Sequence, residues 1–322
     1  MVRRRTGWPP GLAAGLAILL ALAAVGLAAP WLATDRAWIV RATDGLHFPA
    51  WSGDPSVPIG VSNHDPAPLL RAPIPYGPNR VDLGVTLRPP SATHWLGTDD
   101  LGRDVAARMV HGARVSMAVG LLAAALAVGV GVPLGAWAGY RRRWADFLVS
   151  RVVEAGLSFP TLLLALAVLS FSRGWLAAVP DATRIAVVLG LTGWMPIARY
   201  VRAEVLKLTE SDVVAAARAA GGNDVRIVAR HILPSALAPV LVTAAFAVAA
   251  AIGTEAALSF LGLGVRPPEA TWGVLLAESR EQVGHAWWLV VFPGIALFLA
   301  ILACNLVGEG TRDLLDPRST RR

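Results

Sequence analysis

The stretch VVAAARAAGGNDVRIVARHILP, residues 213–234, is a basic, alanine-rich segment between two long apolar runs. Its first part consists almost entirely of strong helix formers, whereas Gly221, Gly222 and Asn223 form a natural helix end and turn. Asp224 can then cap a second short helix that leads into the next apolar run. The pattern predicts an exposed helix–turn–helix on the cytoplasmic side of a membrane protein. The alternative is a plain linker between two membrane helices.

The composition places most of the chain in a membrane. Of its 322 residues, 55% are hydrophobic and 16% are charged, which is too apolar for an ordinary soluble domain. The single cysteine, Cys304, excludes a disulfide framework and a thiolate metal cluster. The net charge of +7 does not indicate a nucleic-acid partner, because the arginines lie scattered at the ends of apolar runs. We therefore expect contact with membrane lipid and none with nucleic acid.

Catalytic chemistry is not expected from the chain itself. Its one lysine, Lys207, precedes Leu208, whereas a phosphate-binding P-loop needs Gly-Lys followed by Ser or Thr. ATP and Mg²⁺ are therefore expected on partner subunits, and this chain is expected to bind no cofactor. The six histidines lie in loops or near the ends of apolar runs, so no nucleophile and base are expected at membrane depth. No catalytic and no metal-ligating residues are predicted.

Six apolar runs predict an all-α membrane protein with six transmembrane helices. The first run is long enough to cross a hydrocarbon core of roughly 30 Å at about 1.5 Å per residue. The alternative for this run is a secretory signal peptide that is cleaved near Ala29. The six runs cover about residues 10–33, 116–137, 147–171, 185–200, 235–258 and 287–307.

The second and third runs carry residues that predict specific contacts. Gly131, Gly135 and Gly139 recur at four-residue spacing, and such a stripe of small residues lets a neighbouring helix backbone approach closely. Glu154 lies one turn from Arg151, which favours a structural ion pair over a role as an ion relay.

Proline and tryptophan mark the later runs. Pro196 is expected to break the fourth run, since proline removes a helix hydrogen bond. Trp287 and Trp288 open the sixth run and are expected to anchor it at the membrane interface.

A polar, proline-rich segment at residues 34–114 separates the first two runs and cannot cross lipid, because its backbone groups would go unsatisfied there. We expect an extracytoplasmic loop, mostly irregular, with a few short strands. It closes with HWLGTDDLGRDVAARMVHGARVSMAVG, residues 94–120, in which Thr98 or Asp99 can cap a helix that starts near Leu101.

The acidic residues and histidines of this closing stretch have two interpretations. Asp99, Asp100 and Asp104 with His94 and His111 contain metal-ligand residue types, but their spacing matches no closed ligand set and arginines sit among the acids. Local helix caps and ion pairs are the interpretation that we favour.

The distribution of basic residues favours a layout with both termini in the cytoplasm. The expected cytoplasmic segments hold 17 of the 29 basic residues. The predicted organisation has an N-terminus and first helix at 1–33, the extracytoplasmic loop at 34–114, a core of five helices at 115–308 that contains the exposed segment 208–234, and a cytoplasmic tail at 309–322.

Three motifs, in order, resemble permeases of the dipeptide, oligopeptide and nickel family of ABC importers. The resemblance extends over residues 93–317 and looks closest to the C-type subunit of the oligopeptide and microcin branch. The motifs are LGTDDLGRD at 96–104 with Arg108, Gly112, Arg114 and Ser116, the helix–turn–helix at 213–234, and EAALSFLGLGVRPPEATWG at 255–273; the tail GEGTRDLLDPR at 308–318 completes the pattern.

The resemblance implies that the helix–turn–helix is a coupling helix, between the fourth and fifth membrane helices, that docks on a cytoplasmic ATPase. Ala215 stands where the family usually has Glu, and Asp212, one helical turn earlier, can replace that charge. The residues to which the resemblance gives this role are Asp212, Ala215, Ala216, Ala217, Arg218, Gly221, Arg230, His231 and Pro234.

On the outer side the resemblance implies two further groups of site residues. Glu255 and Ser259 are candidates for the solute path or its gate, and an ion pair between Glu255 and Arg266 is the equal alternative. The outer-side motif comprises Gly97, Thr98, Asp99, Asp100, Gly102, Arg103 and Asp104.

By resemblance, the function is that of a transmembrane permease subunit that moves solute by alternating access in a bacterial inner membrane. The implied partners are a second homologous permease, two cytoplasmic ATPases and an extracytoplasmic solute-binding protein. Peptides are the expected solute, and nickel or another small solute is the alternative. A secondary transporter is the alternative from a different class.

Overall fold

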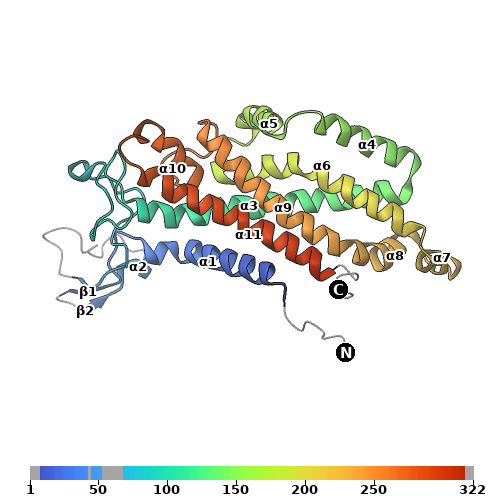
Figure 1. Cartoon of the computed structure of the whole chain (residues 1–322), viewed down its shortest axis with the longest axis horizontal. Helices are drawn as coiled ribbons and strands as arrows, with labels where there is room; N and C mark the ends of the chain where they lie inside the picture. Colours follow the sequence, from blue (N-terminus) through green and yellow to red (C-terminus); the bar gives the residue numbers. More distant parts are fainter. Residues whose placement is uncertain (1–7, 43–44, 53–67, 316–322) are drawn as a thin grey trace. The chain divides into compact units, whose positions relative to one another are not determined.

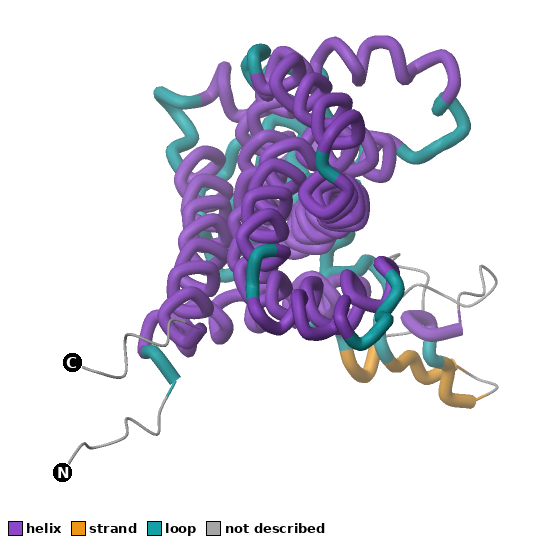
Figure 2. Tube along the Cα trace, turned by 90° about the vertical axis from the view of Figure 1, so that its right-hand side faces the viewer, coloured by secondary structure: helices purple, strands orange, loops and turns teal. Residues whose placement is uncertain are grey.

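The computed structural model describes residues 8–42, 45–52 and 68–315, and helices dominate them (Figures 1 and 2). The ends of both expected cytoplasmic termini, and residues 43–44 and 53–67 of the expected outer loop, lie outside the described residues. The chain divides into two compact units, each described by itself. The first unit comprises residues 1–19, 119–258 and 299–322, and the second comprises residues 20–118 and 259–298.

Among the described residues, four helices are long and apolar enough to cross a membrane, and they coincide with the first, second, fifth and sixth expected apolar runs. They are α1 (Pro10–Leu32), α3 (Val105–Arg141), α9 (Leu233–Phe260), whose apolar part is Pro239–Phe260, and α11 (Trp288–Leu315).

The third expected span is not the single transmembrane helix that was predicted. The run forms two helices, α4 (Arg143–Leu157) and α5 (Thr161–Trp175), which are bent by 97° at the break between them. Pro160 lies in the break, and proline disfavours helical backbone in the residue that precedes it. Taken together as one bent span, α4 and α5 raise the number of possible membrane spans in the described part of the chain to five. Arg151 and Glu154 of α4 form the expected ion pair at 2.8 Å.

The expected break at Pro196 was also wrong, because α6 (Asp181–Thr209) runs through this proline without interruption. Residues on both sides of Pro196 are buried, at Met195, Ile197 and Ala198, and they pack into two different core clusters. Packing of these residues stabilises the helix against the loss of one backbone hydrogen bond. Because its ends carry charged residues, α6 is not among the four helices that are long and apolar enough to cross a membrane.

The glycine stripe of α3 packs directly on the backbone of α6, as predicted. A Cβ atom added at Gly131 would lie 2.8 Å from the carbonyl oxygen of Trp194, and one at Gly135 would lie 2.5 Å from that of Ala198. At Gly139 the corresponding distance, to Arg202, is 2.8 Å. Side chains larger than hydrogen therefore do not fit between these two helices.

Replacing Gly135 with valine is expected to destabilise the first unit by about 1–3 kcal/mol, because the side chain forces α3 away from α6. Gly129 of the same helix provides the matched control, since a Cβ atom there meets nothing within 4 Å. Thermal unfolding of the purified protein in detergent should show a lower midpoint for Gly135→Val than for Gly129→Val. Equal midpoints would contradict the close packing of the two helices.

Short helices join the long ones in both units. In the first unit, α7 (Asp212–Ala219) and α8 (Asp224–Ile227) follow α6, and the π-helical turn η2 (Val228–Ile232) leads into α9. The second unit contains α2 (Pro49–Ser52), the 3₁₀ turn η1 (Leu83–Val85), α10 (Trp272–Glu278) and the 3₁₀ turn η3 (Ser279–Gln282).

The second unit also contains a small antiparallel sheet in the order β2-β1-β3, drawn in orange in Figure 2. Its strands are β1 (Ile39–Ala42), β2 (Gly45–His47) and β3 (Pro68–Leu70). Val40 of the central strand pairs with His47 on one side and with Pro68 on the other. Val40 is fully buried, so the sheet anchors this part of the polar segment.

Candidate functional site

The first candidate site is the helix–turn–helix formed by α7 and α8. The turn is closed by two backbone hydrogen bonds, from the Gly221 N–H to the Arg218 carbonyl and from the Gly222 N–H to the Ala217 carbonyl, each 3.0 Å long. This arrangement is a Schellman motif, which requires a residue with left-handed backbone. Gly221 supplies it with a φ of +80°. The predicted helix end at Gly221 is therefore confirmed.

The expected cap of the second helix was wrong by one residue. The Asn223 side chain, rather than that of Asp224, caps α8 by accepting a hydrogen bond of 2.8 Å from the Arg226 N–H. Asn223 has the extended backbone that a capping residue needs, and Asp224 is already the first residue of the helix.

Apolar side chains hold this segment against the rest of the first unit. Val214, Ile227 and Ile232 are buried in one core cluster with Val201 and Val205 of α6. The opposite side of the segment is exposed, and Val213 and Val225 have 61% and 76% of their surface accessible.

Most residues that the resemblance assigns to ATPase contact lie on this exposed side. Ala217 and His231 are half-buried. A shallow groove runs along α8 and η2 and is lined by Asn223, Val225, Arg226, Ala229, Arg230 and Pro234. The exposed members of the predicted set are Asp212, Ala215, Ala216, Arg218, Gly221, Arg230 and Pro234.

Tyr140, near the end of α3, contacts both halves of the helix–turn–helix and was missed in the sequence. Its hydroxyl donates a hydrogen bond of 2.7 Å to the Asp224 carboxylate. The Arg218 guanidinium lies over its ring, 5.4 Å from the centroid. The one signal in the sequence is an aromatic residue directly after the glycine stripe, which does not identify its partners.

The second candidate site is the outer-side motif, which forms a tight loop before α3. Asp99 Oδ1 accepts hydrogen bonds from the backbone N–H groups of Leu101 and Arg103, at 3.0 and 2.9 Å. Gly102 has a φ of +71° and contacts the Asp82 carbonyl so closely that a Cβ atom would lie 1.8 Å from it. The loop therefore requires glycine here for both conformation and space.

The helix after this loop starts later than predicted. It begins at Val105 rather than near Leu101, and Asp104 acts as its cap by accepting a hydrogen bond of 2.8 Å from the Ala107 N–H. The prediction that Thr98 or Asp99 caps it was wrong, because these two side chains bind within the loop. The Thr98 hydroxyl donates to the Val85 carbonyl at 2.5 Å.

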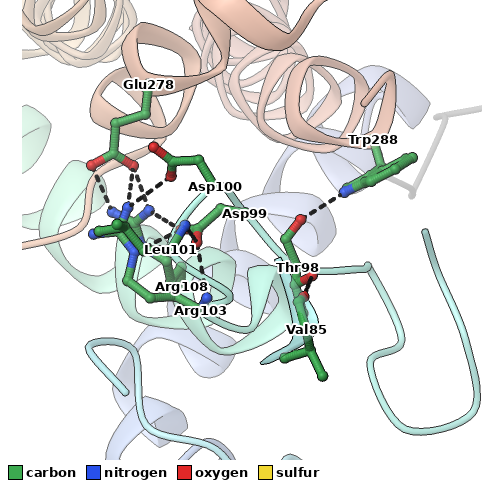
Figure 3. Close-up of polar contacts among 9 residues, drawn as sticks. All are labelled: Val85, Thr98, Asp99, Asp100, Leu101, Arg103, Arg108, Glu278 and Trp288. Carbon is green, nitrogen blue, oxygen red and sulfur yellow. Dashed lines mark hydrogen bonds and ion pairs between the residues drawn. The ribbon is translucent and has the colours of Figure 1, made fainter. Parts of the chain in front are cut away.

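A buried ion-pair cluster joins this loop to α10 (Figure 3). Asp99 Oδ2 accepts from Arg103 Nε at 2.7 Å and from Arg108 Nη1 at 2.8 Å. Glu278 accepts from Arg103 Nη2 at 3.1 Å and, through both carboxylate oxygens, from Arg108. Two cations and two anions therefore neutralise one another, although Arg108 exposes only 1% of its surface. Asp100 lies at the edge, 3.7 Å from Arg103, with 48% of its side chain exposed.

Glu278 was missed in the sequence, where it is one acid in a short helix far from the motif. Packing at Trp272 brings α10 to α3. The Trp272 indole N–H donates to the Met109 carbonyl and its backbone N–H donates to the Ser116 hydroxyl, each at 3.2 Å. The favoured interpretation of the acids in the motif as caps and ion-pair partners is confirmed.

The two histidines of the motif also have local partners. His94 Nδ1 lies 2.8 Å from Asp104, and its ring stacks on Tyr76 with 4.5 Å between centroids. His111 Nε2 lies 2.9 Å from the Ala33 carbonyl. Within residues 8–42, 45–52 and 68–315, no three His, Cys, Asp or Glu side chains are grouped as metal ligands.

The interfacial role predicted for Trp288 was wrong. This tryptophan is buried, and its indole N–H donates to the Thr98 carbonyl at 3.1 Å, as Figure 3 shows. Its neighbour Trp287 exposes 54% of its surface. The path candidates Glu255 and Ser259 lie four residues apart in α9, and both are buried.

Comparisons with known proteins support one family. Residues 131–321 match the model of the family described as "Binding-protein-dependent transport system inner membrane component". A putative peptide transport system permease protein of Brucella suis is 44% identical over 242 residues, which is 75% of this chain and 79% of the relative. The dipeptide transport system permease protein DppC of Alkalihalophilus pseudofirmus is 41% identical over 232 residues, with 72% of this chain and 74% of the relative covered.

Solved structures of an inward-facing MetNI methionine ABC transporter share the fold. One of them has a TM-score of 0.52 and 19% identity, and the match covers 66% of this chain and 96% of the other. At this identity the likeness shows the fold alone. The family model and the curated relatives show the rest: the chain belongs to the binding-protein-dependent transport system inner membrane components and is a permease subunit of an ABC importer.

Proposed function

We propose that this permease subunit imports short peptides. The observation that carries the proposal is the set of relatives at about 40% identity, which are described as peptide, dipeptide and di/tripeptide permeases. A glutathione transport system permease of Pectobacterium atrosepticum, 38% identical over 229 residues, extends this set to a tripeptide.

The proposed layout has six membrane crossings and both termini in the cytoplasm. The bent pair α4 and α5 forms one crossing, and α6 forms another although its ends are charged. The bias of basic residues toward the expected cytoplasmic segments supports this orientation. Residues 34–114 then lie outside the cell, where a solute-binding protein delivers the peptide.

The proposed partners are a second homologous permease, two ATPases and the solute-binding protein. ATP and Mg²⁺ bind to the ATPases, since this chain lacks the Gly-Lys-Ser/Thr sequence of a P-loop. The exposed side of α7 and α8 docks on one ATPase. Its exposed Val213 and Val225, together with Arg218, offer the mixture of apolar and cationic contacts that suits a protein cleft.

The proposed mechanism is a two-state cycle. ATP binds more tightly to the closed ATPase pair than to the open pair, and this difference shifts the equilibrium between the two states of the permease. The helix–turn–helix carries the movement to α3 and α6 as a rigid body. Glu255 and Ser259 line the solute path, and the outer-side motif supports the outer end of α3.

Transport assays with defined solutes test the substrate class. The complete transporter, with both permeases, the ATPases and the binding protein, is reconstituted in vesicles and supplied with labelled dipeptides, tripeptides, glutathione, methionine or Ni²⁺. ATP-dependent uptake of peptides, with little uptake of methionine and Ni²⁺, is expected. Uptake restricted to Ni²⁺ or methionine would overturn the peptide assignment, and uptake by this chain alone without ATP would favour a secondary transporter.

A further inference from the structure

Tyr140 occupies the junction between α3 and the helix–turn–helix. It is half-buried at the end of α3, and its ring packs on the apolar core beneath α7 and α8. The hydroxyl donates a hydrogen bond to Asp224 at the start of α8. The face of the ring contacts the guanidinium of Arg218, in the last turn of α7. One side chain of a long apolar helix therefore contacts both short helices, on either side of the Gly221 turn.

The two contacts of Tyr140 reinforce each other. A hydrogen bond from a phenol to a carboxylate increases the electron density of the ring, which strengthens its attraction for a cation above the ring face. Arg218 and Asp224 carry opposite charges and approach the same ring from α7 and α8. The arrangement also accounts for the cap of α8, because Asn223 takes the capping role and leaves the Asp224 carboxylate to accept from Tyr140.

The polar contacts of Tyr140 fix the position of the helix–turn–helix more strictly than its apolar contacts do. Val214 and Ile227 lie in one apolar cluster with residues of α3 and α6, and this packing is non-directional, which permits sliding. A charge-assisted hydrogen bond fixes distance and direction. Because the stripe at Gly131, Gly135 and Gly139 locks α3 to the α6 backbone, a link to α3 ties the segment to both helices.

We infer that Tyr140 is a positioning residue that latches α7 and α8 to α3, so that a displacement of the helix–turn–helix by the ATPase moves the cytoplasmic half of α3. This inference rests on the proposed coupling role of α7 and α8. The latch transmits movement rather than binding nucleotide or solute.

Distance measurement in the assembled transporter tests the latch without a known solute. Cys304, the single cysteine, is replaced with alanine, and spin labels are placed by Ala219→Cys in α7 and Arg141→Cys at the end of α3. With Tyr140 present, the label separation is expected to be the same without nucleotide and with ATP and vanadate. In Tyr140→Leu the separation should change between the two conditions. An unchanged separation in this variant overturns the inference.

Transport stoichiometry gives the second readout. In vesicles supplied with an equimolar mixture of labelled dipeptides, Tyr140→Leu should consume about fivefold or more ATP per peptide imported than the parent transporter. Tyr140→Phe keeps the ring and loses the hydroxyl, so an intermediate ratio is expected. The double variant Tyr140→Phe with Asp224→Ala should consume no more ATP per imported peptide than Asp224→Ala alone, because the hydroxyl has already lost its acceptor. Tyr200→Phe, on exposed α6 surface, is the matched control and should match the parent.

A variant of Gly221 separates failure of the latch from failure of the coupling role. If Gly221→Val uncouples hydrolysis from uptake while the Tyr140 variants keep the parental ratio, the latch is wrong and the coupling role stands. If neither position changes the ratio, the coupling role itself is wrong, and the latch is overturned with it.

Discussion

Replacing Arg108 with methionine is expected to destabilise the second unit by about 3–5 kcal/mol, because among the described residues it leaves Arg103 as the one cation paired with the buried Asp99 and the partly buried Glu278. Methionine fills a similar volume, so the loss of charge and hydrogen bonds dominates the effect. Unfolding of the purified permease in detergent, followed through tryptophan fluorescence, measures the change.

Two further variants separate the charge of Arg108 from its geometry. Arg108→Lys keeps the charge and cannot bind the two carboxylates with a planar fork, so an intermediate loss of stability is expected. Asp100→Asn serves as the control, because Asp100 is half exposed and lies 3.7 Å from Arg103. Asp100→Asn should lower the free energy of unfolding by no more than about 1 kcal/mol. Equal effects of Arg108→Met and Asp100→Asn would show that the buried cluster does not hold α10 to α3.

Replacing Gly221 with valine is expected to abolish most uptake while ATP hydrolysis and assembly of the complex continue. Gly221 has a φ of +80°, and a Cβ atom there would meet nothing within 4 Å. The cost is therefore conformational: a β-branched residue in left-handed backbone is strained by roughly 1–2 kcal/mol, which opens the Schellman turn between α7 and α8. Peptide uptake and ATP hydrolysis, measured in the same vesicles, give the amount of ATP consumed per imported peptide.

Asparagine at the same position is the matched control. Gly221→Asn adds a side chain of similar size to valine, but asparagine tolerates left-handed backbone. Its uptake should stay within about twofold of the parent, since its strain is small. If Gly221→Asn and Gly221→Val lose uptake to the same extent, side-chain bulk at the ATPase contact, rather than turn geometry, is responsible.

Two features that depend on neighbouring residues were read correctly from the sequence, although the residues that cap α3 and α8 were not. The glycine stripe at Gly131, Gly135 and Gly139 packs against a helix backbone, and the helix end at Gly221 is where its neighbours indicate. Such features follow from backbone conformation and helical spacing, which a single sequence displays directly.

Predictions failed where distant packing competes with a local preference. Pro196 was expected to break its helix, yet the packing of the buried residues around it keeps α6 continuous. Trp288 was assigned to the membrane interface from its aromatic pair, yet its indole N–H donates to the Thr98 carbonyl in the loop before α3, 190 residues away in sequence. In both cases burial and hydrogen bonding outweigh the tendency of the residue type.

The amino-acid sequence alone determined that this protein is a helical membrane permease, because its apolar content and the order of its family motifs can be read directly along the chain. The tertiary structure alone decided which side chains far apart in the sequence become partners. Arg108 meets Glu278 across 170 residues, and Tyr140 meets Asp224 across 84. These pairs depend on which helices pack together, and local propensity and periodicity carry no information about contacts at such separations.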